Sequence, residues 1–296
     1  MDFPLTQYLT TFFRGHPLIL VDIGARWGMD RRWASFGESI AAFCFEADAA
    51  ECSRLNAQGL ANVKFIPEVI AGSNGIATLY ETKFQASSGL YQVNDKFFGR
   101  LLNSDNGTLL GTRAVTTKTL DLVREEYQIP EPDFLKLDVE GAELDILKTS
   151  DLGGTFGVLT EFRFHEEING SAPFWQLDAY MRSQGFMLYD LAVGRQSRKT
   201  LPYPTPMTRY TNGERFFTAT TRGQVMDGDA VYFRDPMRFQ MDRMQILRAA
   251  CLFEVFGLND CAAELLKERE AEAMVDVDYC LNVLAGGDYK KYMEAY

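Results

Sequence analysis

The sequence predicts an α/β protein built on a doubly wound, mostly parallel sheet. In one stretch, the apolar run of residues 134–137 ends at Asp138, and leucines at helical spacing follow Gly141. This is the pattern of a buried strand that turns at once into a helix. In another stretch, the aliphatic residues 18–21 lead into Asp22 and a glycine-rich turn. Each stretch is half of a β–α–β unit, so we expect both strands to lie in one parallel sheet.

The length and composition are those of an ordinary globular protein. The chain has 296 residues, of which 46% are hydrophobic and 24% are charged, so one or two domains are expected. The formal net charge of −11 argues against nucleic-acid binding and against docking on anionic membranes.

The five cysteines predict a reduced compartment, because their number is odd and no C-x-x-C pair occurs. No apolar run approaches the ~20 residues of a membrane span. The first residues lack the basic-then-apolar pattern of a secretory signal. We therefore expect no membrane span and a cytoplasmic location.

The first predicted helix covers residues 5–14, and the glycine turn after the first strand reads D-x-G-x-x-x-G over residues 22–28. This turn is not the G-x-G-x-x-G of dinucleotide-binding folds. A ligand could approach the backbone at Gly24 and Gly28, which have no Cβ. The next predicted strand, residues 41–46, ends in Glu46, about 20 residues beyond the turn, where doubly wound folds place the acid that binds ribose hydroxyls. A plain surface acid is the alternative.

Further elements follow in order. Residues 48–57 are predicted to be helical, and the strand of residues 63–67 puts Glu68 and Val69 at the same edge of the sheet. Residues 76–80 are interpreted as a strand of an added hairpin. The polar residues 84–111 indicate a long loop, which is either a lid or simply mobile. The sequence Thr119-Leu-Asp predicts the start of a helix within residues 116–127.

Polar side chains follow the two central strands. Asp138 and Glu140 end one strand, and His165 follows the alternating strand of residues 157–164. Ligands of open α/β sheets bind at the carboxyl ends of the strands. Glu140 could instead complement the dipole of the following helix. His165 could be a base, a metal ligand or a hydrogen-bonded bystander.

The last third is predicted to close the sheet and then to become helical. Helical and apolar patterns predict a helix at 174–184, strands at 186–193, 216–221 and 230–233, and a loop at 200–213. After Pro236, apolar residues recur at helical spacing, which predicts two or three helices. We therefore expect two domains, residues 1–235 and 236–296. The apolar stripes of the second suggest a homo-oligomer or a protein partner.

Several motifs together resemble the FkbM family of S-adenosylmethionine-dependent methyltransferases, which have a class I, Rossmann-like fold. Arg26 and Ala47 depart from the Asn and Pro that are frequent in that family, and the helical tail is not part of its core. The resemblance covers roughly residues 18–192, and its motifs are D-I-G-A-R-W-G (22–28), F-E-A-D (45–48), S-S-G-L (87–90), T-L-D (119–121) and D-F-L-K-L-D-V-E-G-A-E-L-D-I-L-K (133–148).

The resemblance implies S-adenosylmethionine as the cofactor, and it implies where the parts of that cofactor would lie. The glycine turn would line the methionine end, through Asp22, Gly24, Ala25 and Gly28. Glu46 would accept the ribose hydroxyls, Glu68 and Val69 would flank the adenine, and Asp138 would face both the sulfonium and the acceptor.

The chemistry of the residues agrees with a methyl donor that is a cation, because the predicted edge is acidic. A neutral hydroxyl is a poor nucleophile, so a base would help, and the candidates are Asp138, Glu140, Glu161 and His165. A metal between such acids is possible, but their spacing does not demand one. We predict an O-methyltransferase acting on a hydroxyl of a sugar, glycan or secondary metabolite. The alternatives are a non-catalytic scaffold that binds a partner through its tail and a nicotinamide-dependent oxidoreductase.

Overall fold

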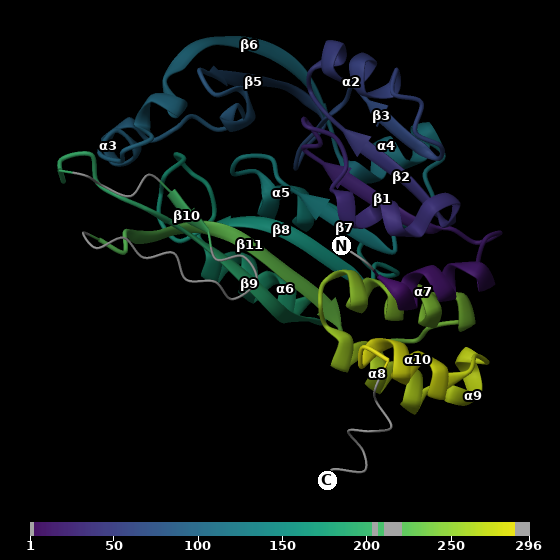
Figure 1. Ribbon diagram of the computed structural model, residues 1–296. Helices are drawn as coiled ribbons and strands as arrows, with labels where there is room; N and C mark the ends of the chain where they lie inside the picture. The colour runs from purple at the N-terminus through teal and green to yellow at the C-terminus, as the bar shows by residue number, and fades with distance from the viewer. Residues whose placement is uncertain (1–2, 203–206, 210–220, 288–296) are drawn as a thin grey trace.

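An eight-stranded sheet forms the centre of the molecule (Figure 1). The computed structural model describes residues 3–202, 207–209 and 221–287. The strand order is β10-β9-β11-β8-β7-β1-β2-β3. In chain order the strands are β1 (Leu18–Ile23), β2 (Ile40–Phe45), β3 (Val63–Ile66), β7 (Phe134–Leu137), β8 (Gly157–Arg163), β9 (Phe186–Gln196), β10 (Met207–Arg209) and β11 (Gln224–Arg234).

The prediction of a mostly parallel α/β sheet is confirmed. Strands β3, β2, β1, β7 and β8 run parallel, whereas β11, β9 and β10 pair antiparallel at the other end. Asp22 lies beside Lys136 in the register of β1 and β7. Because the parallel strands all end at one edge, the polar residues after them meet there.

Helices cover both faces of the sheet, and alternate strand residues supply the two cores. Phe134 packs into one core and Leu135 into the other, as the alternation of a strand requires. One face is covered by α1 (Pro4–Leu9), η2 (Arg31–Ser39), α2 (Ala49–Asn56), α7 (Arg243–Val255) and α8 (Asn259–Glu268). The other is covered by α4 (Leu120–Tyr127), α5 (Glu143–Lys148) and α6 (Phe174–Ser183).

The predicted helix starts at residues 48 and 119 are confirmed by their caps. The Asp48 side chain accepts hydrogen bonds from two amides of the first turn of α2, and Thr119 accepts one from the Leu122 amide of α4. A side-chain oxygen at this position satisfies amides that the helix itself leaves without partners.

A second sheet, of order β4-β6-β5, forms an arm that arches over the carboxyl edge of the first (Figure 1). We call residues 75–118 the β5–β6 arm. The hairpin strand predicted at 76–80 is β5. The loop predicted at 84–111 is wrong in part, because it holds short helices and the start of β6. The elements are β4 (Val69–Ile70), β5 (Gly75–Thr82), η3 (Gln85–Ser87), α3 (Asp95–Phe98), η4 (Ser104–Gly107) and β6 (Leu109–Lys118).

The C-terminal helices pack against the N-terminal helix and the underside of the sheet. The buried Glu254 of α7 accepts hydrogen bonds from the amides of Leu5 and Thr6 at 2.9 and 2.7 Å, and so caps α1. Phe253 and Phe256 pack on Phe233 of the sheet. The tail has more helices than predicted, since α9 (Glu270–Ala273) and α10 (Val277–Leu284) follow α8. The division into domains at residue 236 stays a prediction.

Two further expectations concern the segment before β11. Strand β10 lies inside the loop predicted at 200–213, so that prediction is wrong for residues 207–209. The strand predicted at 216–221 falls almost wholly outside the described residues. Within the described ranges, no helix is both long and apolar enough to cross a membrane.

Candidate active site

The glycine turn crosses the end of β7, and this crossing requires a glycine. Gly24 has a φ of +87°, and a Cβ placed on it would lie 1.8 Å from the backbone oxygen of Asp138. The Gly24 and Ala25 amides donate to the Phe45 carbonyl of β2 at 3.0 Å. The ends of β1, β2 and β7 are thereby held close together.

Asp22 forms an ion pair inside the fold and does not line the cavity. Its side chain is buried, and its Oδ1 accepts a hydrogen bond from Lys136 Nζ at 2.9 Å. Burial raises the pKa of Asp22, and the Lys136 charge opposes that rise. The predicted residues Ala25 and Gly28 also lie outside the lining, within the turn that supports it.

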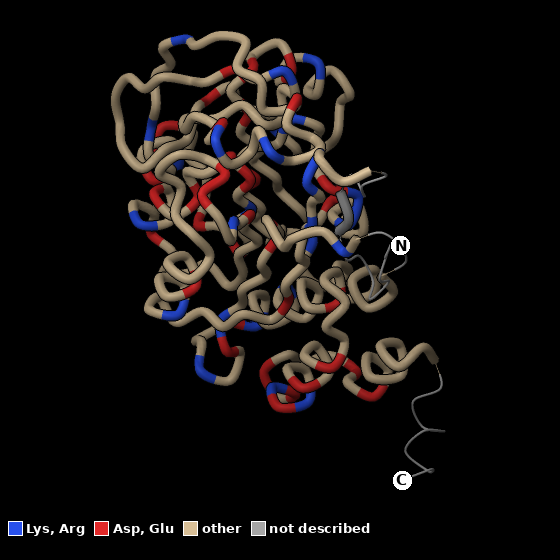
Figure 2. Tube along the Cα trace, turned by 90° about the vertical axis from the view of Figure 1, so that its left-hand side faces the viewer, with Lys and Arg blue, Asp and Glu red and all other residues tan. Residues whose placement is uncertain are grey.

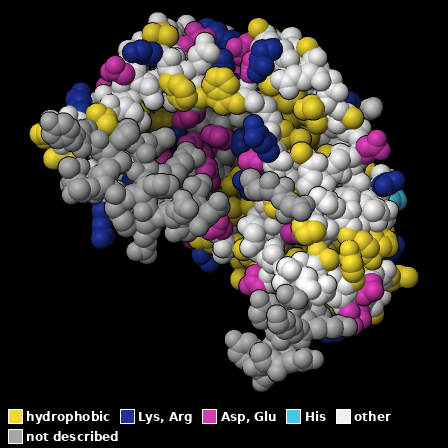
Figure 3. Space-filling view, in the orientation of Figure 1, with side chains coloured by type: hydrophobic (Ala, Val, Ile, Leu, Met, Phe, Trp, Pro, Cys, Tyr) yellow, Lys and Arg dark blue, Asp and Glu magenta, His cyan; other side chains and the backbone are white. Residues whose placement is uncertain are grey.

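A cavity of about 480 Å³ lies between the carboxyl edge and the β5–β6 arm. Volumes of ~300–1,000 Å³ are typical of small-molecule sites. Figure 3 shows acidic side chains gathered in the hollow beneath the arm, and Figure 2 shows acidic positions gathered in the same central region. Of the predicted site residues, the cavity is lined by Gly24, Glu46, Glu68, Val69, Asp138 and Glu140.

Glu46 is nearly buried at the end of β2, with 8% of its surface exposed. Its Oε1 accepts hydrogen bonds from the Asp48 amide at 2.9 Å and from Arg26 Nη1 at 3.4 Å. Burial raises the pKa of Glu46, whereas the Asp48 amide and the Arg26 charge act in the opposite direction. The carboxylate is thus held in one orientation at the cavity wall.

Glu68 and Val69 line the cavity next to the base of the β5–β6 arm. Glu68 Oε1 accepts hydrogen bonds from Lys118 Nζ at 2.8 Å and from the Tyr127 hydroxyl at 2.9 Å. Val69 begins β4 and pairs with Thr117 of β6. These contacts join the wall of the cavity to the foot of the arm.

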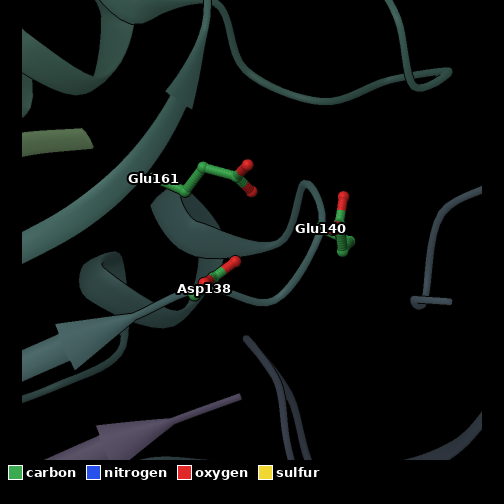
Figure 4. Close-up of side chains that lie close together, drawn as sticks. All are labelled: Asp138, Glu140 and Glu161. Atoms are coloured by element: carbon green, nitrogen blue, oxygen red, sulfur yellow. The ribbon is translucent and has the colours of Figure 1, made fainter. Parts of the chain in front are cut away.

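Three carboxyl groups meet at the far end of the cavity (Figure 4). Asp138 follows β7, Glu140 lies in the next loop and Glu161 belongs to β8; their oxygens lie within 4.8 Å of one another. A set of this kind could coordinate a divalent cation. However, Arg163 Nη2 already donates to Glu140 at 2.5 Å and to Glu161 at 3.0 Å, so a cationic side chain balances the two less exposed carboxyls.

The electrostatics of this group differ from one acid to the next. Burial raises the pKa of Glu140 to about 8, with Asp138 and Glu143 acting in the same direction and Arg163 against it. Burial also raises the pKa of Glu161. The Asp138 side chain is 45% exposed, whereas that of Glu161 is 8% exposed. An exposed carboxyl and two more buried carboxyls therefore lie side by side.

Glu140 itself has a φ of +59°, which is unusual for a residue with a side chain. The arm passes directly over it, because a Cβ placed on Gly89 would lie 3.1 Å from the Cβ of Glu140. The S-S-G-L motif thus supplies the one residue type that lets the arm approach this closely. The strained backbone and the close approach both serve to place Glu140 beneath the arm.

His165 lies apart from the three carboxyl groups and does not line the cavity. Its Nε2 lies 3.1 Å from the Val225 carbonyl and 2.9 Å from Gln224 Nε2, and its ring stacks on Phe97. The bystander interpretation fits these contacts best. Sequence reasoning missed Arg163, which ends β8 between Phe162 and Phe164. Only the nearby Glu161 could have signalled it.

Comparisons with known proteins identify the domain. The family model described as the methyltransferase FkbM domain matches residues 22–188. No curated protein matches the sequence.

Solved structures resemble the chain at low sequence identity. Precorrin-6y C5,15-methyltransferase from Geobacter metallireducens is 10% identical, covers 77% of this chain and 87% of its own, and has a TM-score of 0.33. The 1,6-didemethyltoxoflavin-N1-methyltransferase of Burkholderia thailandensis is 11% identical, with coverages of 79% and 80% and a TM-score of 0.32. TYW2 of M. jannaschii is 13% identical, with coverages of 79% and 78% and a TM-score of 0.30.

Proposed function

The chain belongs to the methyltransferase FkbM domain family, and from this premise we propose that it methylates a hydroxyl of a sugar, glycan or secondary metabolite. It is an S-adenosylmethionine-dependent methyltransferase with a Rossmann-like α/β fold. One observation supports the proposal of O-methyl transfer above all. Three carboxyl groups, two from the loop after β7 and one from β8, share one cavity with the acid that follows β2.

The residues of the cavity fit the cofactor. The acids that line it outnumber the basic residues, Arg26 and Arg113, so its potential favours a cation. Glu46 offers a carboxylate oriented by the Asp48 amide, which suits the two ribose hydroxyls. We assign Gly24 to the methionine end, and Glu68 and Val69 to the adenine. Asp22, Ala25 and Gly28 support these positions from outside the cavity lining.

When bound, S-adenosylmethionine supplies a methyl group on a positively charged sulfur. The task of the protein is then to align the acceptor oxygen with that methyl group, since direct displacement depends on orientation. Asp138 is the acid that we place closest to both. Its exposed carboxylate can accept a hydrogen bond from the acceptor hydroxyl and orient it.

Glu140 is the residue that we propose as the base. Its carboxylate takes the hydroxyl proton as the oxygen forms its bond to carbon, and the bond between that carbon and sulfur breaks. A pKa near the operating pH suits a general base, and burial raises the pKa of Glu140 to about 8. Arg163 holds this carboxylate through a hydrogen bond.

The acceptor class is the finer part of the proposal. Carboxylates that accept hydrogen bonds suit a polyhydroxylated acceptor. The net charge of −11 favours a small molecule or a glycan over a nucleic acid. We also propose a cytoplasmic location, which is supported by five free cysteines, four of them buried as thiols.

The proposal is tested in two steps with the full chain. Calorimetry should first detect binding of S-adenosylmethionine and S-adenosylhomocysteine. A panel of methyl glycosides, phenols and amines is then tested for release of S-adenosylhomocysteine, and the product is identified by mass spectrometry. A methylated hydroxyl supports the proposal. Transfer to nitrogen or carbon alone would reject O-methylation but leave the methyltransferase activity intact.

A further inference from the structure

Arg26 joins the wall of the cavity at Glu46 to the β5–β6 arm through a single guanidinium group. Its Nη1 lies 3.4 Å from Glu46 Oε1, and its Nη2 lies 3.3 Å from Asp48 Oδ2. The same Nη2 donates a hydrogen bond to Gln85 Oε1 at 2.5 Å. Glu46 and Asp48 follow β2, whereas Gln85 begins η3 in the arm. All four residues line the same cavity.

We propose that Arg26 is a positioning residue that couples cofactor binding at Glu46 to the placement of the β5–β6 arm over the cavity. The proposal rests on the assignment of Glu46 to the ribose hydroxyls in the proposed function. It extends that function, because it makes the arm respond to whether the cofactor is bound. An acceptor would then meet a completed cavity only after the cofactor has entered.

The electrostatic part of the coupling acts on Glu46. The charged groups that face this carboxyl are Arg26, Asp48 and Glu51, and the two acids favour its protonation. Arg26 is the cation that opposes them. Only an ionised carboxylate can accept hydrogen bonds from both ribose hydroxyls with its two oxygens. Arg26 therefore keeps Glu46 in the form that the cofactor needs.

The mechanical part acts on the arm. A guanidinium presents a rigid planar fork of donors, so it can bind partners from two elements at once, whereas a lysine ammonium has no such fork. The Arg26 side chain is 18% exposed, which limits competition from water. Its Nε is buried and has no hydrogen-bond partner among the described atoms, so all its hydrogen bonds are made by the two terminal nitrogens, while the Trp27 ring lies 5.8 Å from the guanidinium carbon. A shift of Glu46 on cofactor binding is thereby transmitted to Gln85.

The experiment compares four variants of the full chain. Arg26→Ala removes both links, Arg26→Lys keeps the charge, and Gln85→Ala cuts only the link to the arm. Lys83→Ala is the matched control, because Lys83 is an arm cation that pairs with Asp105 outside the cavity. Calorimetry measures the affinity for S-adenosylhomocysteine and for 5′-methylthioadenosine, which keeps the ribose but lacks the amino-acid part. Hydrogen exchange at saturating S-adenosylhomocysteine reports on residues 80–90.

Arg26→Ala should weaken both ligands alike by about tenfold, the scale of one hydrogen bond to a charged group. The loss should grow as the pH is lowered, because Glu46 without Arg26 takes up a proton more readily, and Arg26→Lys should remove that pH dependence. Gln85→Ala should weaken both ligands as well, but by less than Arg26→Ala, because it loses only the free energy that couples binding to the arm. In the wild type and in Lys83→Ala the ligand should protect residues 80–90 from exchange. This protection should be lost in both Arg26 variants and in Gln85→Ala.

Two results would overturn the proposal. One is unchanged protection of the arm in Arg26→Ala and Gln85→Ala at saturating ligand. The other is a loss of affinity for S-adenosylhomocysteine alone, which would assign Arg26 to the methionine end instead. Failure of the wild type to bind either ligand is a distinct outcome, because it would reject the proposed function itself.

Discussion

Arg163 Nη2 on β8 donates a hydrogen bond to Glu140 Oε2, 2.5 Å away in the loop after β7. The same nitrogen donates to Glu161 at 3.0 Å. One buried cation thus holds two carboxyl groups that would otherwise repel each other. Removing one partner of such a pair leaves an uncompensated charge, which costs more than the pair itself contributes. The acidic end of the cavity therefore depends on a residue that does not line it.

The ribose assignment predicts a defined loss of affinity. Glu46→Ala should weaken S-adenosylmethionine binding by ~1.5–3 kcal/mol, because it deletes hydrogen bonds to a charged acceptor. Calorimetry measures this directly, and circular dichroism confirms that the variant is folded. Glu125→Ala serves as the control, since Glu125 is exposed on α4. Equal affinities for the wild type and Glu46→Ala would remove Glu46 from the site.

The base assignment predicts which acid limits the rate. Glu140→Gln keeps the shape of the side chain and cannot take a proton, so methyl transfer should slow by ~10²–10⁴-fold, the usual contribution of general-base catalysis. Single-turnover measurements at saturating cofactor check this, once an acceptor is known. The wild-type rate should also fall as the pH drops below about 8, since Glu140 must be ionised.

Asp138→Asn is the companion variant. It keeps a hydrogen-bonding group beside the acceptor, so we expect a smaller loss of rate than in Glu140→Gln. It should also lower the pH at which the rate falls, because the Asp138 charge raises the pKa of Glu140. A larger loss in Asp138→Asn than in Glu140→Gln would transfer the base role to Asp138.

The raised pKa values also predict how stability depends on pH. The folded chain raises the pKa of Glu140 from its usual 4.5 to about 8 and that of Glu167 to about 7, in both cases chiefly through burial. At pH values between the usual pKa of 4.5 and these raised values, the native state keeps protons that the unfolded state has released. The free energy of unfolding should therefore fall as the pH rises from 6 to 9. Urea midpoints at constant ionic strength measure this, and Glu140→Gln should show a shallower decline.

The cap of α1 by Glu254 predicts a large loss of stability on its removal. Glu254→Ala leaves the amides of Leu5 and Thr6 without their acceptor in a buried place. We expect the free energy of unfolding to fall by ~2–6 kcal/mol, because two buried amide donors lose their acceptor at about 1–3 kcal/mol each. Urea denaturation should show a lower midpoint. Glu264→Ala, on the exposed side of α8, should change the midpoint little.

A partner for residues 236–296 stays a prediction. Much of the apolar surface that suggested it is buried within the chain, since α7 packs on α1 and the sheet. Met274 remains 68% exposed and Tyr279 46% exposed. If they contact a second copy, light scattering should give a dimer mass for the wild type and a monomer mass for Met274→Glu. A monomeric wild type would contradict self-association.

Local patterns were enough to predict the carboxyl edge, because strand ends and turns are encoded by neighbouring residues. Gly24, Glu46 and Asp138 could be assigned in this way. Strand β6 escaped prediction because most of its residues are exposed, the apolar Leu109 and Leu110 among them, so it lacks the alternation of a half-buried strand. Arg163 and Glu254 escaped because their meaning comes from partners distant in the sequence. Nothing near residue 254 signals a helix that begins at Pro4.

That separation has a consequence for synthesis on the ribosome. The acceptor for the Leu5 amide lies 249 residues further along the chain. A nascent chain that has not yet reached residue 254 has no group to complete the first turn of α1, and β8 has no antiparallel neighbour until β11 emerges. The earliest helix to be made is thus among the last to acquire its final contacts. Its two apolar anchors, Leu5 and Leu9, must wait for α7 before they are buried.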